Sequence, residues 1–442
     1  MDKIIIKDLG DGLILRRSNQ GDTDALAAFN GKIHPDNEAE RMPIEDWTRD
    51  LMEGENPGFN PDGFTIVEDK ASGQIVSAMC LINQTWTYEG IPFGVGRPEL
   101  VGTLPQYRRR GLVREQFKVI HEWSEQQGDL AQAITGIPYY YRQFGYEMAV
   151  YLDAGRFCSL PAPVEEEVFE LRKATEADVP FMALCYENGH QRGVLNCLWN
   201  EAQWKHELKK RPKNINRRDL FIIQRKTGEQ MGYIAAAPTL WGSDVVVITS
   251  FELKPKVSWW EVTPFIARAL GKLGETFAAS ENSEHGASGG KTVQSIGFVL
   301  GEEHPAYQIY GYRMRKKASY NWYLRVPDMI KFLTRISPVL EKRLADSICI
   351  NYTGELITHF YRSGIRWTFE QGKITNLEPW QGEWHAAGAC FPDLTFLQLV
   401  FGYRNLADLE DMFADCWAHN EKAMPLINSL FQKKASYLWP IS

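Results

Sequence analysis

Residues 101–113 constrain the fold of this chain more than any other stretch; they read Val-Gly-Thr-Leu-Pro-Gln-Tyr-Arg-Arg-Arg-Gly-Leu-Val. This pattern predicts a strand, a tight basic turn and the start of a helix. A helix N-terminus leaves about four amide groups without an intrahelical acceptor and carries a partial positive charge, so it stabilises an anion. Gly111 lets the backbone approach closely, and the arginines of the turn add fixed charge. The run therefore predicts a phosphate-binding turn.

The helix that follows this turn is predicted from its apolar spacing. Leu112, Val113, Phe117, Ile120 and Trp123 recur at helical intervals, and Gly128 is placed to end the helix. A basic turn that contains glycine is also typical of a solvated charged surface, so the turn taken alone leaves both interpretations open.

A second motif, Tyr-Arg-Gln-Phe-Gly-Tyr at residues 141–146, lies about thirty residues further along the chain. In order and spacing, Arg108-x-x-Gly111-x-Val113 and this segment resemble the acetyl-CoA site of the GNAT N-acetyltransferases. The Arg-Arg-Arg-Gly-Leu form of the turn is similar to that of the Eis-type (enhanced intracellular survival) enzymes, although Val113 replaces the small residue usual in the family. The resemblance implies an N-acetyltransferase with acetyl-CoA as co-substrate.

The resemblance also implies that Tyr141 protonates the departing thiolate of CoA. A thiol with a pKa of about 8.5 leaves more readily when a phenol within hydrogen-bond distance supplies a proton. The residues themselves leave a second interpretation open, in which the aromatic side chains of residues 139–146 form a core cluster.

Two further sets of contacts follow from the same resemblance. Acetyl-CoA contacts are implied at Val101, Gly102, Thr103, Arg109, Arg110, Gly111, Leu112, Val113, Arg114, Gly136 and Ile137. In Eis-type enzymes the carboxylate of the last residue accepts the proton of the amine, which implies that role for Ser442, although the family usually ends in an aromatic residue. A frayed chain end is the alternative interpretation of residues 437–442.

An internal repeat predicts two domains of one fold. Residues 15–22, Leu-Arg-Arg-Ser-Asn-Gln-Gly-Asp, return as Leu-Arg-Lys-Ala-Thr-Glu-Ala-Asp at 171–178, each predicted as a short strand followed by an Asp that caps a helix. The segment that begins at Tyr141 is echoed from Tyr307. Residues 252–261 of the second copy contain no Arg-x-x-Gly turn, so we expect that copy not to bind the co-substrate.

We expect three domains and an α/β (α+β) fold class. Residues 1–160 form the catalytic GNAT domain, residues 161–325 a degenerate second GNAT domain, and residues 326–442 an α+β domain that resembles sterol carrier proteins. Together they form two tandem GNAT folds followed by a sterol-carrier-protein-like domain.

Local patterns predict the elements of the second and third domains. Residues 280–290 are predicted as a polar loop, since their matches to the nucleophile-elbow and Walker A patterns lack the strand and the helix that those motifs need. We predict strands over 292–300, 347–352, 356–361 and 365–370, and helices over 327–344 and 420–431.

Composition narrows the class of protein. No stretch reaches the ~18 apolar residues of a membrane span, and the first eight residues are too charged for a signal peptide, which predicts a cytoplasmic protein away from membranes. Seven cysteines without a Cys-x-x-Cys pair, and nine histidines without ligand spacing, predict neither disulfides nor a metal. The formal charge of −7 argues against nucleic acid as a partner.

Residues 34–62 hold nine acidic side chains against Arg41 and Arg49. In GNAT folds this region shapes the acceptor site, so the resemblance implies a cationic acceptor. A solvated acidic surface is the alternative interpretation.

Two functions from different classes follow. The first is transfer of an acetyl group to the primary amine of a small cationic molecule, aminoglycoside- or polyamine-like, or of a lysine. The second is a carrier or sensor of an apolar ligand that uses the acetyltransferase folds as a scaffold. The family resemblance further implies a homo-oligomer, such as a hexamer.

Overall fold

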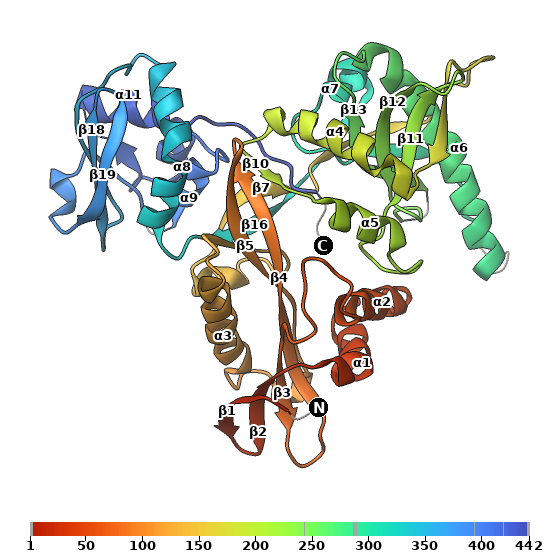
Figure 1. Ribbon diagram of the computed structural model, residues 1–442, viewed down its shortest axis with the longest axis horizontal. Coiled ribbons are helices and arrows are strands. Elements are labelled where there is room, and N and C mark those ends of the chain that lie inside the picture. Colours follow the sequence, from red (N-terminus) through yellow and green to blue (C-terminus); the bar gives the residue numbers. More distant parts are fainter. Residues whose placement is uncertain (1–2, 243, 286–289, 393, 419, 440–442) are drawn as a thin grey trace.

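The structure is a computed structural model that describes residues 3–242, 244–285, 290–392, 394–418 and 420–439. Three lobes each surround one β-sheet, and the fold is mixed α/β throughout (Figure 1). The sheets follow the predicted order of domains along the chain, but two strands cross between neighbours. Within the described residues, no helix is both long enough and apolar enough to cross a membrane.

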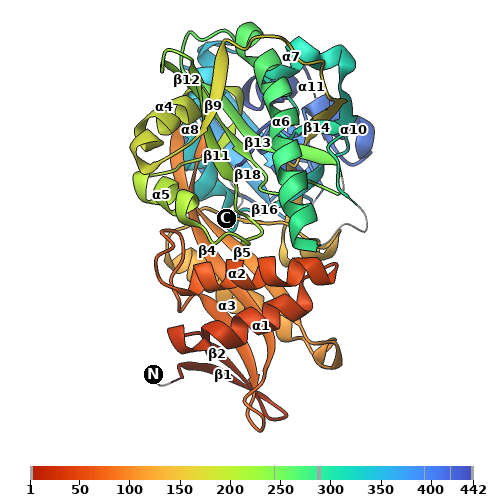
Figure 2. The same ribbon diagram turned by 90° about the vertical axis from the view of Figure 1, so that its right-hand side faces the viewer.

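The first sheet runs in the order β1-β2-β3-β4-β5-β6-β16-β7, and β10 pairs with β4. Its strands are β1 (Ile5–Gly10), β2 (Leu13–Arg17), β3 (Phe64–Asp69), β4 (Ile75–Tyr88), β5 (Ile91–Thr103), β6 (Ala131–Ile134), β7 (Glu147–Leu152), β10 (Leu195–Cys197) and β16 (Tyr320–Arg325). Helix α3 (Leu112–Gln126) covers one face, while α1 (Thr23–Ile33) and α2 (Arg41–Met52) cover the other (Figures 1 and 2). β16 arrives from residues that precede the predicted third domain, so the first sheet is completed by a distant part of the chain.

The second sheet runs in the order β15-β8-β14-β13-β12-β11-β9. Its strands are β8 (Gly155–Ser159), β9 (Phe169–Lys173), β11 (Asp219–Arg225), β12 (Gln230–Ala236), β13 (Val245–Leu253), β14 (Ser295–Phe298) and β15 (Arg315–Lys317). Its helices are α4 (Val179–Gly189), α5 (Glu201–Lys209), α6 (Trp259–His285) and α7 (Pro305–Tyr310). β8 lies before residue 160 yet pairs here, in exchange for β16.

The third sheet runs in the order β19-β18-β17-β20-β21. Its strands are β17 (Gly354–His359), β18 (Gly364–Glu370), β19 (Lys373–Trp380), β20 (Ala389–Cys390) and β21 (Trp417–Ala418). Its helices are α8 (Met329–Ala345), α9 (Thr395–Val400), α10 (Leu406–Met412) and α11 (Asn420–Leu430). Its core is continuous with the far end of the first sheet, where Trp86 and Trp322 belong to the same buried cluster as Phe332 and Phe396.

Two local predictions differ from the structure, and one strand was not predicted. The residues at 347–352 form turns instead of a strand, while β19 was not predicted. The polar sequence from 280 to 285 continues α6 instead of starting a loop; residues 286–289 of that predicted loop lie outside the described residues. The strand predicted over 292–300 is confirmed in its centre by β14.

The internal repeat is visible in matching ion pairs. Asp22 accepts two hydrogen bonds from the guanidinium of Arg16, at 2.8 and 2.9 Å, and Asp178 accepts two from Arg172, at 2.6 and 2.8 Å. Asp22 and Asp178 are the N-cap residues of α1 and α4, as predicted, although neither side chain bonds an amide of its α-helix. Each carboxylate instead accepts a hydrogen bond from the backbone amide of Asn19 or Thr175 in the capping box of the preceding turn. Each carboxylate thus ties the end of a strand to the turn that starts the helix.

Both copies contain a pair of parallel strands that diverge. β5 and β6 pair only at Val95 and Gly96, whereas β13 and β14 pair from Val245 to Ile248. In β5 a bulge sets Leu100 and Val101 opposite the single residue Met79, and Leu100 adopts a φ of 53°. A bulge bends the strand that carries it. The separation of β5 from β6, the first splay, is therefore built into the backbone of β5. The separation of β13 from β14 is the second splay.

Candidate active site

A cleft of about 960 Å³ opens where β5 and β6 diverge. Its walls contain the predicted residues Val101, Gly102, Thr103, Arg109, Gly111, Leu112, Val113, Arg114, Gly136, Ile137 and Tyr141. The structure thus brings the basic turn, the strand end and the tyrosine motif into one space. Its volume lies within the range of known ligand sites, about 300–1,000 Å³.

The basic turn presents its backbone and some of its arginines to the cleft. Arg109 and Gly111 both have left-handed backbone conformations, with φ of 62° and 77°, and Gly111 directly precedes α3. Arg108, Arg109 and Arg114 line the cleft. The predicted contact Arg110 does not; its guanidinium lies 3.1 Å from the carboxylate of Asp11. The turn therefore offers an anion the N-terminus of α3 and three cationic side chains.

Gly102 is required by close packing between β5 and the end of α1. A Cβ atom at this position would lie 2.8 Å from Cγ2 of Ile33 and 3.1 Å from Nε2 of His34. A side chain here would push α1 away from the strand, because real Cβ contacts are longer than 3.0 Å. Glycine at this position thus allows the end of α1 to pack directly against β5 beside the cleft.

Tyr141 lies in a short helical turn, η4 (Tyr140–Phe144), with its ring in the core and its hydroxyl beside Gly136. Gly136 has a φ of 125°, and a Cβ atom there would lie 3.2 Å from the Tyr141 hydroxyl oxygen. Burial and the neighbouring Glu99 both raise the pKa of the phenol. The hydroxyl group therefore keeps its proton at neutral pH, as a proton donor must.

Strand β16 supports this segment, a role that was not predicted from the sequence. The hydroxyl of Tyr320 donates a hydrogen bond to the Gly136 carbonyl at 2.6 Å, and the hydroxyl of Tyr323 accepts one from the Tyr139 amide. The rings of Tyr141 and Tyr323 pack edge to face at 5.6 Å. The position of Tyr141 thus depends on a strand 180 residues away in sequence.

Glu99 lines the cleft, although the sequence did not single it out. It lies on β5 before the bulge, with only 9% of its surface exposed. Burial raises the pKa of its carboxyl group, and the ion pair with the fully buried Arg97 acts in the opposite direction. The sequence predicted a strand only from residue 101, and the bulge that turns Glu99 toward the cleft has no sequence signature.

The acidic segment at residues 34–62 does not line the cleft with carboxylates. Its lining residues are His34, Ile44 and Trp47. Glu45 pairs with Arg41 at 3.1 Å, and Asp50 pairs with Arg211 of the second domain at 2.9 Å. These carboxylates therefore hold α2 in place.

The second splay, between β13 and β14, is filled by the chain itself. Tyr437 inserts there, and its hydroxyl oxygen lies 2.9 Å from the Thr249 carbonyl and 2.6 Å from the Val299 carbonyl. Gly301 lacks a side chain where Tyr437 packs, since a Cβ atom would lie 2.8 Å from Cβ of Tyr437. The segment after α11 thus takes the position that stays open in the first domain.

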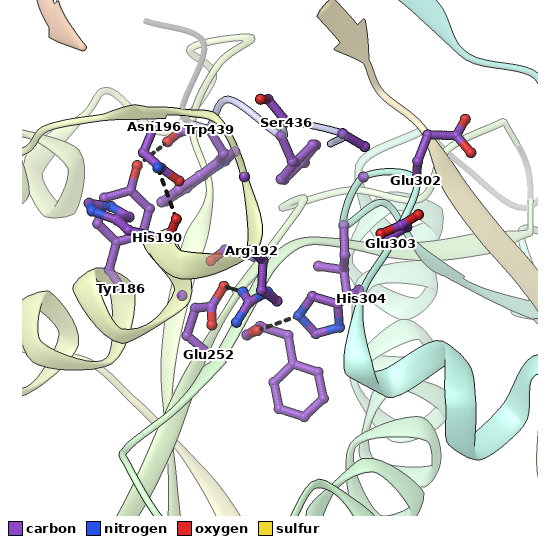
Figure 3. Close-up of a pocket in the computed structure, with 18 residues that line it drawn as sticks. Tyr186, His190, Arg192, Asn196, Glu252, Glu302, Glu303, His304, Ser436 and Trp439 are labelled. Carbon is purple, nitrogen blue, oxygen red and sulfur yellow. Dashed lines mark hydrogen bonds and ion pairs between the residues drawn. The ribbon is translucent and has the colours of Figure 1, made fainter. Parts of the chain in front are cut away.

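What remains of the second splay is a cavity of about 50 Å³ (Figure 3). Arg192 pairs there with the buried Glu252, and Nε2 of His304 donates to the Phe251 carbonyl at 3.1 Å, since Nδ1 accepts from the Ala306 amide. The cavity is far smaller than a ligand site of ordinary size.

Tyr307, the counterpart of Tyr141, has no free hydroxyl group. Its oxygen accepts a hydrogen bond from the Leu300 amide at 3.2 Å and lies 2.9 Å from the Phe298 carbonyl. The second copy therefore repeats the tyrosine without repeating its access to a cleft.

The predicted base, the Ser442 carboxylate, lies outside the described residues. The last described residue, Trp439, is 4% exposed and packs against Trp199 at 5.4 Å between ring centroids. Its carbonyl accepts a hydrogen bond from the Tyr186 hydroxyl at 2.7 Å. The end of the described chain is thus fixed to the second domain.

Residues 15–149 match the family of acetyltransferase (GNAT) domains. This match runs from within β2 to within β7 and includes every residue assigned above to acetyl-CoA. The N-terminal part of the chain is thus a GNAT acetyltransferase domain, and the protein is an N-acetyltransferase; such a domain implies acetyl-CoA as co-substrate. No curated protein matches the chain.

Solved structures share the fold over almost the whole chain. A probable N-acyltransferase from Enterococcus faecalis has a TM-score of 0.65 at 12% identity, covering 96% of this chain and 98% of that one. A GCN5-related N-acetyltransferase from Anabaena variabilis has a TM-score of 0.64 at 12% identity, covering 96% and 99%. Eis1 from Mycobacterium abscessus has a TM-score of 0.59 at 11% identity, covering 96% and 99%. At these identities the likeness shows the fold.

Proposed function

We propose that the protein transfers the acetyl group of acetyl-CoA to a primary amine, carried by a small molecule or by a lysine, in the cleft of the first domain. The observation that carries the proposal is the meeting of the basic turn, the β5–β6 splay and the protonated Tyr141 in one cleft. When bound, acetyl-CoA would supply the activated acetyl group. Gly111 leaves the backbone accessible beside the proposed phosphate site, since a Cβ atom there would meet nothing within 4 Å.

Different residues of the cleft would bind the phosphate groups and supply the proton. Arg108, Arg109 and Arg114, with the first amides of α3, bind the phosphate groups. Tyr141 holds a proton at its hydroxyl oxygen for the sulfur leaving group. Arg110 faces Asp11, which makes its assignment the weakest of the predicted contacts.

The amine must lose a proton before or during attack, because its pKa is about 10.4. Glu99 supports this step best among the described lining residues, since its carboxylate lies in the cleft and its pKa is raised. The Ser442 carboxylate, implied by the resemblance, is the second candidate. Glu99→Gln should lower kcat at pH 7, whereas a short Gly/Ser extension after Ser442 should do so only if the terminal carboxylate is the base.

The resemblance to Eis-type enzymes also supports roles for the other two domains. We propose residues 161–325 as a degenerate GNAT domain and residues 326–442 as a sterol-carrier-protein-like domain, with assembly into a homo-oligomer. The alternative function, a carrier of an apolar ligand, has less support, because the cavity between β17 and α11 measures about 180 Å³. That is below the size of ordinary ligand sites.

Release of free CoA from acetyl-CoA in the presence of an amine panel tests the function. We expect release that depends on an amine, and binding of one CoA per chain by calorimetry. Absence of CoA binding would overturn the proposal.

A further inference from the structure

The side of the cleft formed by α1 and α2 has apolar walls. Ile33 ends α1, Ile44 and Trp47 lie one turn apart on α2, and Ile215 reaches in from the second domain. The Ile215 amide donates a hydrogen bond to the Pro43 carbonyl at 3.2 Å, so its loop is held against α2. An aliphatic and indole surface thus surrounds the space beyond the acetyl-transfer point.

This side of the cleft also carries no surplus negative charge. Burial lowers the pKa of His34 to about 4, so its imidazole is neutral at pH 7. Glu99 is balanced by its ion pair with Arg97. The other charged side chains among the described residues of the lining are arginines of the turn and of α3.

The nearby acidic residues are engaged elsewhere. Arg41 and Arg49 neutralise Glu45, and Arg49 lies 3.8 Å from Asp46. Asp50 receives Arg211 and also accepts a hydrogen bond from the Asn214 side chain at 2.6 Å. Glu45, Asp46 and Asp50 therefore help to fix α2 and the second domain, and no acidic residue of 34–62 is among the described residues that line the cleft.

A polycation would fit this space poorly. Each additional ammonium group would lose hydration against Ile33, Ile44 or Trp47 without a carboxylate to replace the water. An apolar body gains affinity there instead, by roughly fourfold for each methylene group buried.

We propose that the acceptor is a primary amine on an apolar body of about the size of an aromatic ring, with the amine toward Glu99 and Tyr141 and the body between α1, α2 and Ile215. This inference rests on the proposed function and names the substrate class of the same site.

Equilibrium binding to the protein saturated with CoA tests the proposal without turnover. The matched probes are 2-phenylethylamine and 1,4-diaminobutane, which share one primary amine and differ in an aromatic ring against a second ammonium group. We expect calorimetry to give a Kd about tenfold lower for 2-phenylethylamine, and the same order in kcat/KM from CoA release. Tighter binding of 1,4-diaminobutane would overturn the proposal.

Two variants locate the binding surface. Trp47→Ala should weaken 2-phenylethylamine about tenfold and leave the Kd for CoA unchanged, whereas Met42→Ala, on the exposed face of the same helix, should change neither. Ile215→Asp adds a carboxylate at a residue that is 38% exposed, so the fold should tolerate it. It should shift preference toward 1,4-diaminobutane; an unchanged preference in both Trp47→Ala and Ile215→Asp would contradict the assigned surface.

Failure of this inference and failure of the proposed function give different results. If the protein releases CoA faster with 1,4-diaminobutane or an aminoglycoside than with 2-phenylethylamine, the acceptor class is wrong and the acetyltransferase function stands. If acetyl-CoA does not bind, or no amine in the panel promotes CoA release, the proposed function itself is wrong.

Discussion

The two strand splays of this molecule have the same construction and differ in what fills them. In the first, β5 and β6 separate around a cleft of about 960 Å³; in the second, β13 and β14 separate around Tyr437 and leave about 50 Å³. His34 and His190 follow Asp22 and Asp178 by the same number of residues, and each lines the pocket of its own copy. The comparison teaches that the fold opens a space between two strands in each copy, while a few residues decide whether that space can bind a ligand.

Three differences separate the copies. The first has an arginine turn before α3, while α6 begins after a Lys-Pro-Lys segment with Glu261 in its first turn. The first splay is open, and the second is closed by the chain. The hydroxyl of Tyr141 interacts with the Ile137 backbone and lies beside Gly136 in the cleft, whereas that of Tyr307 is held by three backbone groups. Each difference can be tested separately.

Removing the residue that fills the second splay should have the largest effect. Tyr437→Ala loses a packed ring and a hydroxyl group that lies between the Thr249 and Val299 carbonyls, which should lower stability by about 3 kcal/mol. Thermal unfolding measures this, with Tyr437→Phe as the control that keeps the ring and should lose about 1 kcal/mol. Calorimetry should still give one CoA per chain, because the second copy has no arginine turn. A second bound CoA in Tyr437→Ala would show that the chain end alone excludes the ligand.

Substitution of the paired tyrosines should separate catalysis from structure. Tyr141→Phe removes the proposed proton donor and should lower kcat about a hundredfold with little change in the Kd for CoA. Tyr307→Phe should leave kcat unchanged while lowering the melting temperature, since its hydroxyl bonds backbone groups in the core. Equal losses of kcat in the two variants would remove the functional distinction between the copies.

The arginines of the turn should differ in how much each contributes to CoA binding. Arg109→Glu should weaken CoA binding by about 1.5 kcal/mol or more, because a charge-assisted phosphate contact is replaced by repulsion. Arg110→Glu is the matched control at the next residue; it loses an exposed pair with Asp11 and should change the Kd for CoA much less. Calorimetric titration with CoA checks both, and a larger loss in Arg110→Glu would reverse the assignment.

Much of the first domain could be predicted from the sequence because its signals are local. The arginine turn, Gly111 and the spacing of α3 lie within one short stretch, and the internal repeat predicts a second domain of the same fold. The predicted helices at 327–344 and 420–431 are confirmed as α8 and α11 within a few residues. Short-range periodicity is sufficient for such elements.

The remaining features depend on contacts that no local pattern encodes. The exchange of β8 and β16 between sheets joins residues at least 136 positions apart. Glu99 faces the cleft because of a bulge at Leu100, and Tyr437 fills the second splay from the far end of the chain. The net charge of residues 34–62 suggested a cationic acceptor, but charge counted along a sequence does not show which carboxylates are already paired.

The smallest expected effect concerns the buried carboxyl group in the second splay. Burial raises the pKa of Glu252 to about 7, against an opposite effect from Arg192. Since its pKa in the unfolded chain is about 4.3, the folded state binds more protons between these values, and this contribution to stability falls as pH rises through that window. Glu252→Gln mimics the protonated form, so its melting temperature should gain a few degrees on the wild type between pH 5 and pH 8. Glu303→Gln, at the exposed rim of the same pocket, is the control and should show no such trend. A difference in melting temperature that does not change with pH for Glu252→Gln would contradict the assigned titration. The same variant should leave kcat unchanged, whereas Glu99→Gln should lower it.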